Sequence, residues 1–253
     1  MTGRRGEAGA ALFDFDGTLI DSFSPRKKAH KAVGEFLAAY LCNQGCDLKR
    51  EVLLESISRL EGEMNERRVY DRNLWWEEVL RGYMGEAIRI PSSLLAGASS
   101  IYWETVRRNS RLYPGIDNML ESLRQRGVIM GLISDTDGLE GMKLVRIEES
   151  RLRGFFDAIV VAGEDTKEVK PSPQPFTRAC ELLNVVPNRS VFVGDNPEID
   201  IIGAKKLGMK TVIIGGEKLQ YRKGVFRPDF FIKRENVKEL EDLIQQLLEK
   251  RER

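Results

Sequence analysis

Two aspartates, Asp14 and Asp16, stand at the end of an apolar run that begins at Ala10, and Gly17 follows them directly. In a β-strand, residues two positions apart point to the same side, so both carboxylates would face one region. Two carboxylates at that spacing repel each other unless a cation or a shared proton intervenes. The pair therefore indicates a metal-binding or phosphate-binding site. A polar strand end at a turn, which Gly17 permits, would contain the same residues.

Polar residues occupy similar positions later in the chain. Ser134 and Asp195 each end an apolar run, and Lys170 precedes Pro171 and a predicted helix. A strand-end hydroxyl can donate a hydrogen bond to a phosphate oxygen, and an ammonium group can stabilise phosphate charge. Taken alone, however, Ser134 is more typical of a helix N-cap, and Lys170 of a solvated surface charge.

The elements that position these residues alternate between short apolar runs and helical patterns. The runs predict strands at residues 10–15, 128–133, 158–162, 190–195, 211–214 and 230–232, the last at an edge. Helices are predicted between them, including one over residues 139–153 and an amphipathic terminal helix over 237–250. This alternation is typical of a Rossmann-like α/β fold, a parallel sheet with helices on both faces. Ligands bind such sheets at the carboxyl ends of the strands, where Asp14, Asp16, Ser134 and Asp195 are expected.

Residues 21–111 have a different texture, with helical periodicity and few strand-like runs. We therefore predict two domains, an α/β core formed by residues 1–20 and 112–253 and an inserted α-helical domain formed by residues 21–111. Trp75 and Trp76 are predicted to pack in the interior of the helical domain. Arg26, His30 and Arg72 also lie in this block, and the sequence assigns a site role to none of its residues.

Four segments resemble the motifs of the haloacid dehalogenase (HAD) superfamily, and they occur in that family's order. They are Asp14-Phe15-Asp16-Gly17-Thr18-Leu19, Leu132-Ile133-Ser134-Asp135, Lys170-Pro171-Ser172-Pro173 and Gly194-Asp195-Asn196-Pro197-Glu198-Ile199-Asp200. The helical block stands where this family often carries a cap domain, between the first and second motifs.

The resemblance implies a role for each acidic residue. Asp14 would be the nucleophile that attacks the phosphoryl group, and Asp16 would protonate the leaving alcohol and then deprotonate the attacking water. Mg²⁺ would be held by Asp14, the backbone carbonyl of Asp16 and Asp195. Asp200 would lie in the second coordination sphere and orient a metal water or Lys170.

The resemblance also implies that Ser134, Asp135 and Lys170 bind the phosphate group. The presence of an aspartate at position 16 indicates that the substrate is a phosphate ester and not a compound with a carbon–halogen bond, because a halide leaving group needs no proton. The chain is thus expected to be a Mg²⁺-dependent phosphatase that hydrolyses a small phosphorylated metabolite through an aspartyl-phosphate. A phosphoryl-transfer sugar-phosphate mutase of the same fold and a non-catalytic binding module are the alternatives.

The composition excludes several other classes of protein. The chain has 40 basic and 39 acidic residues, which gives no basic surplus for nucleic acid. No apolar run approaches the roughly 20 residues of a membrane span, and the polar segment Met1–Gly9 does not resemble a signal peptide. Three cysteines and one histidine do not match a zinc site. Free thiols favour a reducing compartment, and we expect the cytoplasm.

Overall fold

The computed structural model describes residues 8–46, 48–85, 89–215 and 227–249, so most of the Met1–Gly9 segment lies outside it. The chain forms two compact units. The first, called here the α/β unit, comprises Met1–Asp21, Arg111–Thr136 and Lys143–Arg253. The second, the helical unit, comprises Ser22–Ser110 and Asp137–Met142. Residues 137–142 thus cluster with the helices, whereas the sequence placed them in the α/β core.

The α/β unit is built on a parallel sheet with the strand order β5-β4-β1-β6-β7-β8. Its strands are β1 (Ala11–Phe13), β4 (Met130–Asp135), β5 (Ala158–Ala162), β6 (Val191–Gly194), β7 (Lys210–Gly215) and β8 (Phe230–Lys233). The strand β1 lies between β4 and β6, so the segments that follow these three strands emerge side by side at one edge. This topology confirms the predicted fold class and the edge position of the last strand.

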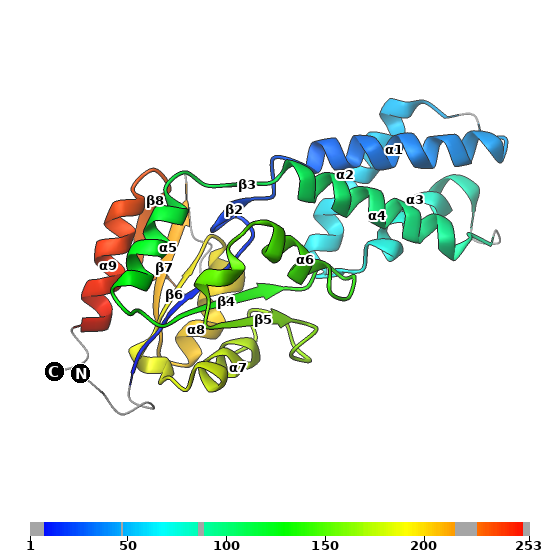
Figure 1. The fold of residues 1–253 in the computed structure, drawn as a ribbon. Helices are drawn as coiled ribbons and strands as arrows, with labels where there is room; N and C mark the ends of the chain where they lie inside the picture. The colour runs from blue at the N-terminus through cyan, green and yellow to red at the C-terminus, as the bar shows by residue number, and fades with distance from the viewer. Residues whose placement is uncertain (1–7, 47, 86–88, 216–226, 250–253) are drawn as a thin grey trace. The chain divides into compact units, whose positions relative to one another are not determined.

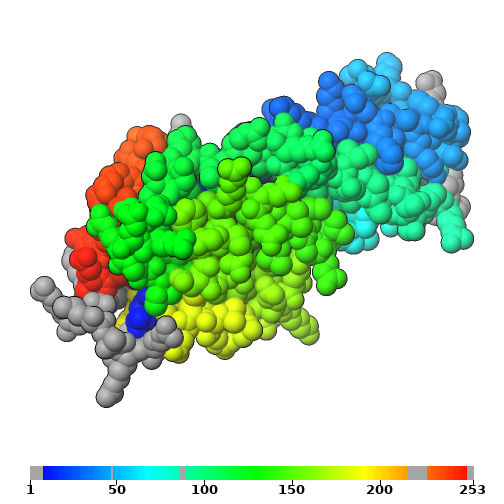
Figure 2. All heavy atoms as spheres, viewed as in Figure 1, coloured from blue at the N-terminus to red at the C-terminus, as the bar shows by residue number. Residues whose placement is uncertain are grey.

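Helices cover both faces of this sheet (Figure 1). The helices of the α/β unit are α5 (Ile116–Gln125), α6 (Met142–Glu149), α7 (Gln174–Leu183), α8 (Ile202–Lys206) and α9 (Val237–Glu249). Short 3-10 turns at Arg153–Phe155 and Pro187–Arg189 and a π-helical turn at Pro197–Ile201 complete it. The helices α5 and α9 pack against each other, green beside red in the space-filling view (Figure 2), while α7 and α8 pack on the opposite face.

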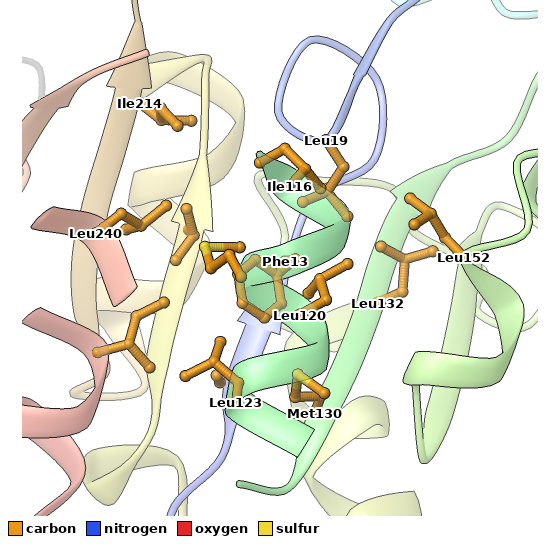
Figure 3. Close-up of a cluster of buried hydrophobic side chains, with 14 of the residues drawn as sticks. Phe13, Leu19, Ile116, Leu120, Leu123, Met130, Leu132, Leu152, Ile214 and Leu240 are labelled. Carbon is orange, nitrogen blue, oxygen red and sulfur yellow. The ribbon is translucent and has the colours of Figure 1, made fainter. Parts of the chain in front are cut away.

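Alternating residues of β1 supply both hydrophobic cores. Phe13 packs with Leu120 and Leu123 of α5, in the cluster drawn in Figure 3. Leu12 points to the other face, into the cluster that contains Phe176. All of these side chains are fully buried. Because successive side chains of a strand alternate between faces, a strand buried on both sides is continuously apolar, as this one is.

The helix predicted over residues 139–153 is shorter in the structure. It begins at Met142 and ends at Glu149. Gly138 and Gly141 both have positive φ angles of 74°, and Arg151 has a φ of 63°. These left-handed residues interrupt helical geometry on either side of α6.

The described residues of the helical unit form four α-helices around an aromatic core. They are α1 (Arg26–Asn43), α2 (Arg50–Glu66), α3 (Arg72–Met84) and α4 (Ser92–Asn109). Trp75 and Trp76 are buried in this core, as predicted, and Trp76 Nε1 donates a hydrogen bond to Ser99 Oγ at 3.0 Å. The side chain of Asp71 caps α3 by accepting from the backbone N–H of Asn73 at 2.9 Å.

A small antiparallel ladder joins the two ends of the long helical segment. The strands β2 (Ile20–Asp21) and β3 (Arg111–Leu112) pair so that Ile20 lies opposite Leu112 and Asp21 opposite Arg111. Among the described residues, no helix has the length and hydropathy that a membrane-spanning segment requires.

Candidate active site

The position of Asp14 is fixed by the strand that precedes it. Its backbone N–H donates to Val193 O of the neighbouring strand at 2.9 Å. The chain then turns sharply at Gly17, which has a φ of 81°, and the Gly17 N–H donates to Ile20 O at 2.8 Å. This turn directs the hydroxyl of Thr18 back to Asp14 Oδ2, at 2.9 Å. Asp14 is only 5% exposed, so its carboxylate is held in a defined orientation.

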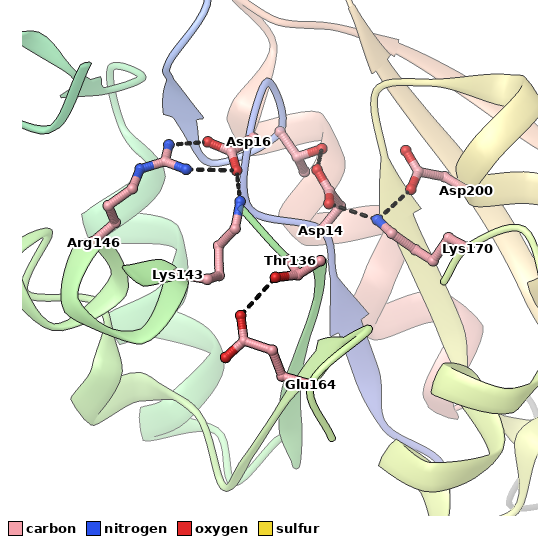
Figure 4. A network of polar contacts seen from close by, with 9 residues as sticks. Asp14, Asp16, Thr136, Lys143, Arg146, Glu164, Lys170 and Asp200 are labelled. Atoms are coloured by element: carbon pink, nitrogen blue, oxygen red, sulfur yellow. Dashed lines mark hydrogen bonds and ion pairs between the residues drawn. The ribbon is translucent and has the colours of Figure 1, made fainter. Parts of the chain in front are cut away.

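Lys170 links Asp14 to Asp200. Its ammonium nitrogen lies 2.6 Å from Asp14 Oδ1 and 2.7 Å from Asp200 Oδ1, as Figure 4 shows. The Lys170 side chain is 2% exposed. Its backbone N–H donates to Asp135 Oδ1 at 3.0 Å, so Asp135 fixes the segment that carries the lysine. Residues from four distant parts of the chain are thus joined in one network.

Asp200 uses both of its carboxylate oxygens within the protein. While Oδ1 accepts from Lys170, Oδ2 accepts from the backbone N–H groups of Asp195 at 3.1 Å and Asn196 at 2.9 Å. The residue is completely buried. Asp200 therefore orients Lys170 and the turn after β6.

The Asp195 carboxylate is different, because it makes no hydrogen bond or ion pair to any residue that the structure describes. One carboxylate oxygen each from Asp14, Asp195 and Asp200 lies within 4.8 Å of the other two. Three clustered carboxylates, one of them without a protein partner, are suited to a hard divalent cation that prefers oxygen ligands. Asp14 accepts one hydrogen bond at each carboxylate oxygen, whereas Asp200 accepts three in all, two of them at Oδ2. Asp14 and Asp195 therefore have the more available oxygens and are the candidate ligands.

Burial and neighbouring carboxylates raise the pKa values of Asp14 and Asp195. Burial raises the pKa of Asp14 to about 6, although the charge of Lys170 lowers it, and the charge of Asp200 raises it further. Burial and the charges of Asp14 and Asp200 hold the pKa of Asp195 well above its usual range. Burial lowers the pKa of Lys170, but Asp14 and Asp200 raise it more, so its ammonium group stays protonated. A cation bound beside Asp14 and Asp195 would relieve this repulsion.

Asp16 lies outside this network and is bound by two cations of α6. Lys143 Nζ donates to Asp16 Oδ2, and the two Nη groups of Arg146 donate to Asp16 Oδ1 and Oδ2 (Figure 4). Both basic side chains are nearly buried, at 4% and 3% exposure. Burial raises the pKa of Asp16, but Arg146 and Lys143 together hold it far below the usual range of a carboxyl group. In this arrangement Asp16 is an ionised carboxylate.

Ser134 and Asp135 end β4, beside the end of β1, and Ser134 is 1% exposed. The next residue, Thr136, donates from Oγ1 to Glu164 Oε1 at 2.6 Å, which ties the end of β4 to the loop after β5. The structure therefore joins Asp14, Asp135, Lys170 and Asp200 directly and places Asp195 and Ser134 on the flanking strand ends. It directs the Asp16 side chain to α6 instead.

Sequence reasoning missed Thr18, Lys143 and Arg146. Thr18 lies four residues after Asp14 in the first motif and was quoted there without a role. Lys143 and Arg146 are three residues apart on α6, so they share one helix face with the apolar Ile147. The spacing of these two basic residues beside an apolar one was the only sequence feature that pointed to a buried role. This feature is a weak signal, because the sequence does not show which acidic residue they would contact.

Comparisons with known proteins identify the family of this chain. Residues 9–208 match the haloacid dehalogenase-like hydrolase family. The N-acylneuraminate-9-phosphatase of Rattus norvegicus is 30% identical over 207 residues, which is 81% of each chain. The glyceraldehyde 3-phosphate phosphatase of Methanopyrus kandleri is 31% identical over 244 residues, 94% of this chain and 97% of the relative.

Among solved structures, a HAD phosphatase from Thermococcus onnurineus has a TM-score of 0.68 at 24% identity and covers 93% of this chain and 97% of its own. That identity supports the fold alone. The family match and the curated phosphatases confirm the expected family and enzyme class, a HAD-like phosphatase. With three of its four motifs at strand ends that meet at one edge of a parallel sheet, this chain belongs to the haloacid dehalogenase-like hydrolase family.

Proposed function

We propose that this protein is a Mg²⁺-dependent phosphatase that hydrolyses a small phosphorylated metabolite through an aspartyl-phosphate on Asp14. The observation that carries the proposal is the Asp14–Lys170–Asp200 network beside the unpartnered carboxylate of Asp195. A buried carboxylate can attack a phosphate group only if nearby positive charge offsets the repulsion between them. Lys170 supplies one such charge, and Mg²⁺ held by Asp14, Asp195 and the Asp16 backbone carbonyl would supply the rest.

In the first step, an Asp14 oxygen attacks phosphorus while the bond from phosphorus to the alcohol oxygen breaks. Thr18 and Lys170 hold the Asp14 carboxylate in place for this attack. The departing alkoxide takes a proton from Asp16. In the second step, Asp16 accepts a proton from water, which attacks the same phosphorus, and the bond between phosphorus and Asp14 breaks. Bound Mg²⁺ would neutralise phosphate charge in both steps.

The ion pairs of Asp16 indicate which of the two chemical steps the observed arrangement suits. With Lys143 and Arg146 bound to it, Asp16 is ionised and resembles the state that must receive the proton of water. Donating a proton to the alcohol requires that Asp16 first become protonated, which is easier once its contacts with the two cations are loosened. Release of Asp16 from α6 is therefore part of the proposed catalytic cycle.

The phosphate group would be bound by Ser134 and Lys170, with Asp135 holding the Lys170 segment in position. Relatives named as N-acylneuraminate-9-phosphatase, glyceraldehyde 3-phosphate phosphatase and ribulose-1,5-bisphosphate 5-phosphatase support a small phosphorylated substrate. We further propose that residues 21–111 form a cap domain. The three free cysteines, Cys42, Cys46 and Cys180, remain consistent with a cytoplasmic protein.

Hydrolysis of p-nitrophenyl phosphate tests the proposal. We expect turnover with Mg²⁺, its loss with EDTA, and a loss of at least about 10³-fold in Asp14→Asn, which keeps the shape of the side chain but removes the nucleophile. Activity retained in a folded Asp14→Asn protein would overturn the nucleophile assignment. Isomerisation of a sugar phosphate without phosphate release would instead identify a mutase, and tight binding without turnover would identify a binding module.

A further inference from the structure

Arg72 is the first residue of α3 and lies in the aromatic core of the helical unit. Its guanidinium carbon is 3.4 Å from the centre of the Trp75 ring, 4.9 Å from that of Tyr102 and 5.2 Å from that of Trp103. The residue is 6% exposed. Aromatic faces attract a cation, so stacking partly explains this position. The donors around the edge of the planar guanidinium are not satisfied by ring faces.

Within the residues that the structure describes, Arg72 forms no ion pair, and its Nε is buried without a hydrogen-bond acceptor. Arginine remains charged even when burial lowers its pKa, as it does here. A buried charge with no counterion is strongly unfavourable, and proteins almost always pair it. A bound anion would supply the counterion that the described residues do not.

Two other polar groups beside Arg72 lack partners in the same described residues. They are the hydroxyl of Tyr102, which is fully buried, and Nε2 of His30. The His30 ring stacks on the Tyr102 ring, with centroids 5.8 Å apart and planes inclined by 29°. Arg72 contacts the same tyrosine, so the three side chains converge around one ring. A phenol and an arginine donate hydrogen bonds readily, and an anion accepts them.

The carboxylate of Glu61 lies beside His30 and Arg26 and is already used. Glu61 Oε1 accepts from Arg26 at 3.2 Å, and Oε2 lies 3.5 Å from His30 Nε2, which is too long for a hydrogen bond. Arg26 and Arg72 together carry two positive charges, and Glu61 offsets one of them. The cluster therefore keeps a surplus of positive charge when His30 is neutral, and burial favours that neutral form by lowering the His30 pKa.

We propose that the helical unit contains a binding site for a small oxyanion, a carboxylate or a phosphate group, centred on Arg72 and completed by Tyr102 and His30. The planar guanidinium suits both anions, because its paired N–H groups match two oxygens of either. The competing explanation is that Arg72 is only a structural stack on aromatic rings. The two explanations differ in what they predict for removal of the charge.

Thermal unfolding of the full chain in EDTA tests the site. Sodium acetate and sodium phosphate are each titrated against sodium chloride at matched ionic strength. We expect either oxyanion to raise the Tm of the wild-type protein by about 5–10 °C near 100-fold excess over Kd. Arg72→Met, which keeps the length of the side chain, should lose this rise and should unfold in chloride at the wild-type temperature or above.

Two variants complete the comparison. Arg72→Lys keeps the charge and should keep part of the rise. Arg59→Met removes an arginine of α2 whose side chain is 78% exposed and should keep all of it. If the Tm of Arg72→Met were well below that of the wild type in every buffer, and oxyanions changed the Tm of neither protein, Arg72 would only stack on the aromatic rings. An equal oxyanion rise in wild type and Arg72→Met would place the anion elsewhere. Either result overturns the proposal.

The oxyanion can be a free ion or the acidic group of a phosphate ester, and one further measurement separates these sources. Asp14→Asn protein is titrated with 2-phosphoglycolate and with ethyl phosphate, which lacks the carboxylate. Tighter binding of 2-phosphoglycolate that Arg72→Met abolishes assigns the site to the ester, and equal binding assigns it to a free ion. Only this measurement depends on the proposed phosphatase function. If the protein were not a phosphatase, the acetate and phosphate titrations would still test the anion site.

Discussion

Gly194 and Asp200 are in such close contact that a side chain at position 194 would overlap the carboxylate. A Cβ atom added to Gly194 would lie 2.5 Å from Asp200 Cγ and 2.6 Å from Asp200 Cβ. Real Cβ atoms essentially never approach other heavy atoms this closely. The glycine therefore allows Asp200 to fold back against the end of β6, where it reaches Lys170 and two backbone N–H groups.

Gly194→Ala should consequently displace Asp200 and weaken all three of its contacts. We expect the free energy of unfolding to fall by about 1–3 kcal/mol, the usual cost of overpacking. Phosphatase activity should fall with it, because Lys170 loses one of its two carboxylate partners. Urea unfolding measures the first effect and turnover of p-nitrophenyl phosphate the second.

Gly62→Ala is the matched control, because nothing lies within 4 Å of a Cβ at this position in α2. It should stabilise the protein by about 0.5–1 kcal/mol, since alanine is the better helix former. If both alanine variants behaved alike, the close contact between Gly194 and Asp200 would have no energetic importance.

Asp195→Asn separates the metal site from the rest of the network. In the wild type, Mg²⁺ at 100-fold excess over its Kd should add about 2.7 kcal/mol to the stability, by preferential binding to the folded state. The variant should lose most of this gain. In EDTA it should be at least as stable as the wild type, because an unpartnered carboxylate beside Asp14 has been removed. Thermal unfolding with and without Mg²⁺ gives both values, and a full Mg²⁺ gain in the variant would contradict the ligand assignment.

Lys170→Met leaves Asp14 and Asp200 buried and facing each other without their shared cation. Breaking a buried ion pair in this way costs about 3–5 kcal/mol, and the 2% exposure of Lys170 leaves little screening by solvent. Urea unfolding of the metal-free protein measures the loss. Lys210→Met is the control, since its side chain is 40% exposed and lies 3.6 Å from Asp229. We expect a loss of less than about 1 kcal/mol there, and comparable losses in the two variants would argue against the buried network.

Asp16→Asn should affect the two chemical steps unequally. With p-nitrophenyl phosphate, whose leaving group departs without a proton, the first step can proceed and the second lacks its base. We expect a burst of about one equivalent of p-nitrophenolate per enzyme, followed by turnover reduced by roughly 10²–10⁴-fold. Stopped-flow absorbance resolves the burst. Asp117→Asn, on the exposed first turn of α5, should show wild-type turnover. Slow turnover without a burst would show that Asp16 acts in the first step alone.

Local patterns predicted the α/β elements well, because each depends on a short stretch of sequence. The strand predicted at residues 158–162 has those bounds in the structure. The helix predicted over 139–153 was too long. Apolar periodicity continues past α6, and the positive φ angles of Gly138, Gly141 and Arg151 that limit it come from the way the chain folds there.

The candidate site was predictable where its residues end strands, since the topology of a parallel sheet brings strand ends together. The partners of Asp16 could not be predicted in this way. More than a hundred residues separate Asp16 from Lys143 and Arg146, and these two residues lie on helix α6 and not at the end of a strand. The same limit applies to Arg72. Only the folded helical unit shows that this side chain is buried and makes no ion pair to a described residue.

Because β2 pairs with β3, the whole segment from Ser22 to Ser110 is topologically equivalent to the loop of a β-hairpin. Because Asp21 lies opposite Arg111, the chain leaves and re-enters the α/β unit at neighbouring points. The cost in chain entropy of accommodating an insertion there depends only weakly on its length. A two-residue Asn-Gly turn could therefore replace the entire segment, and this position is a natural place at which to exchange one helical module for another while the sheet stays unchanged.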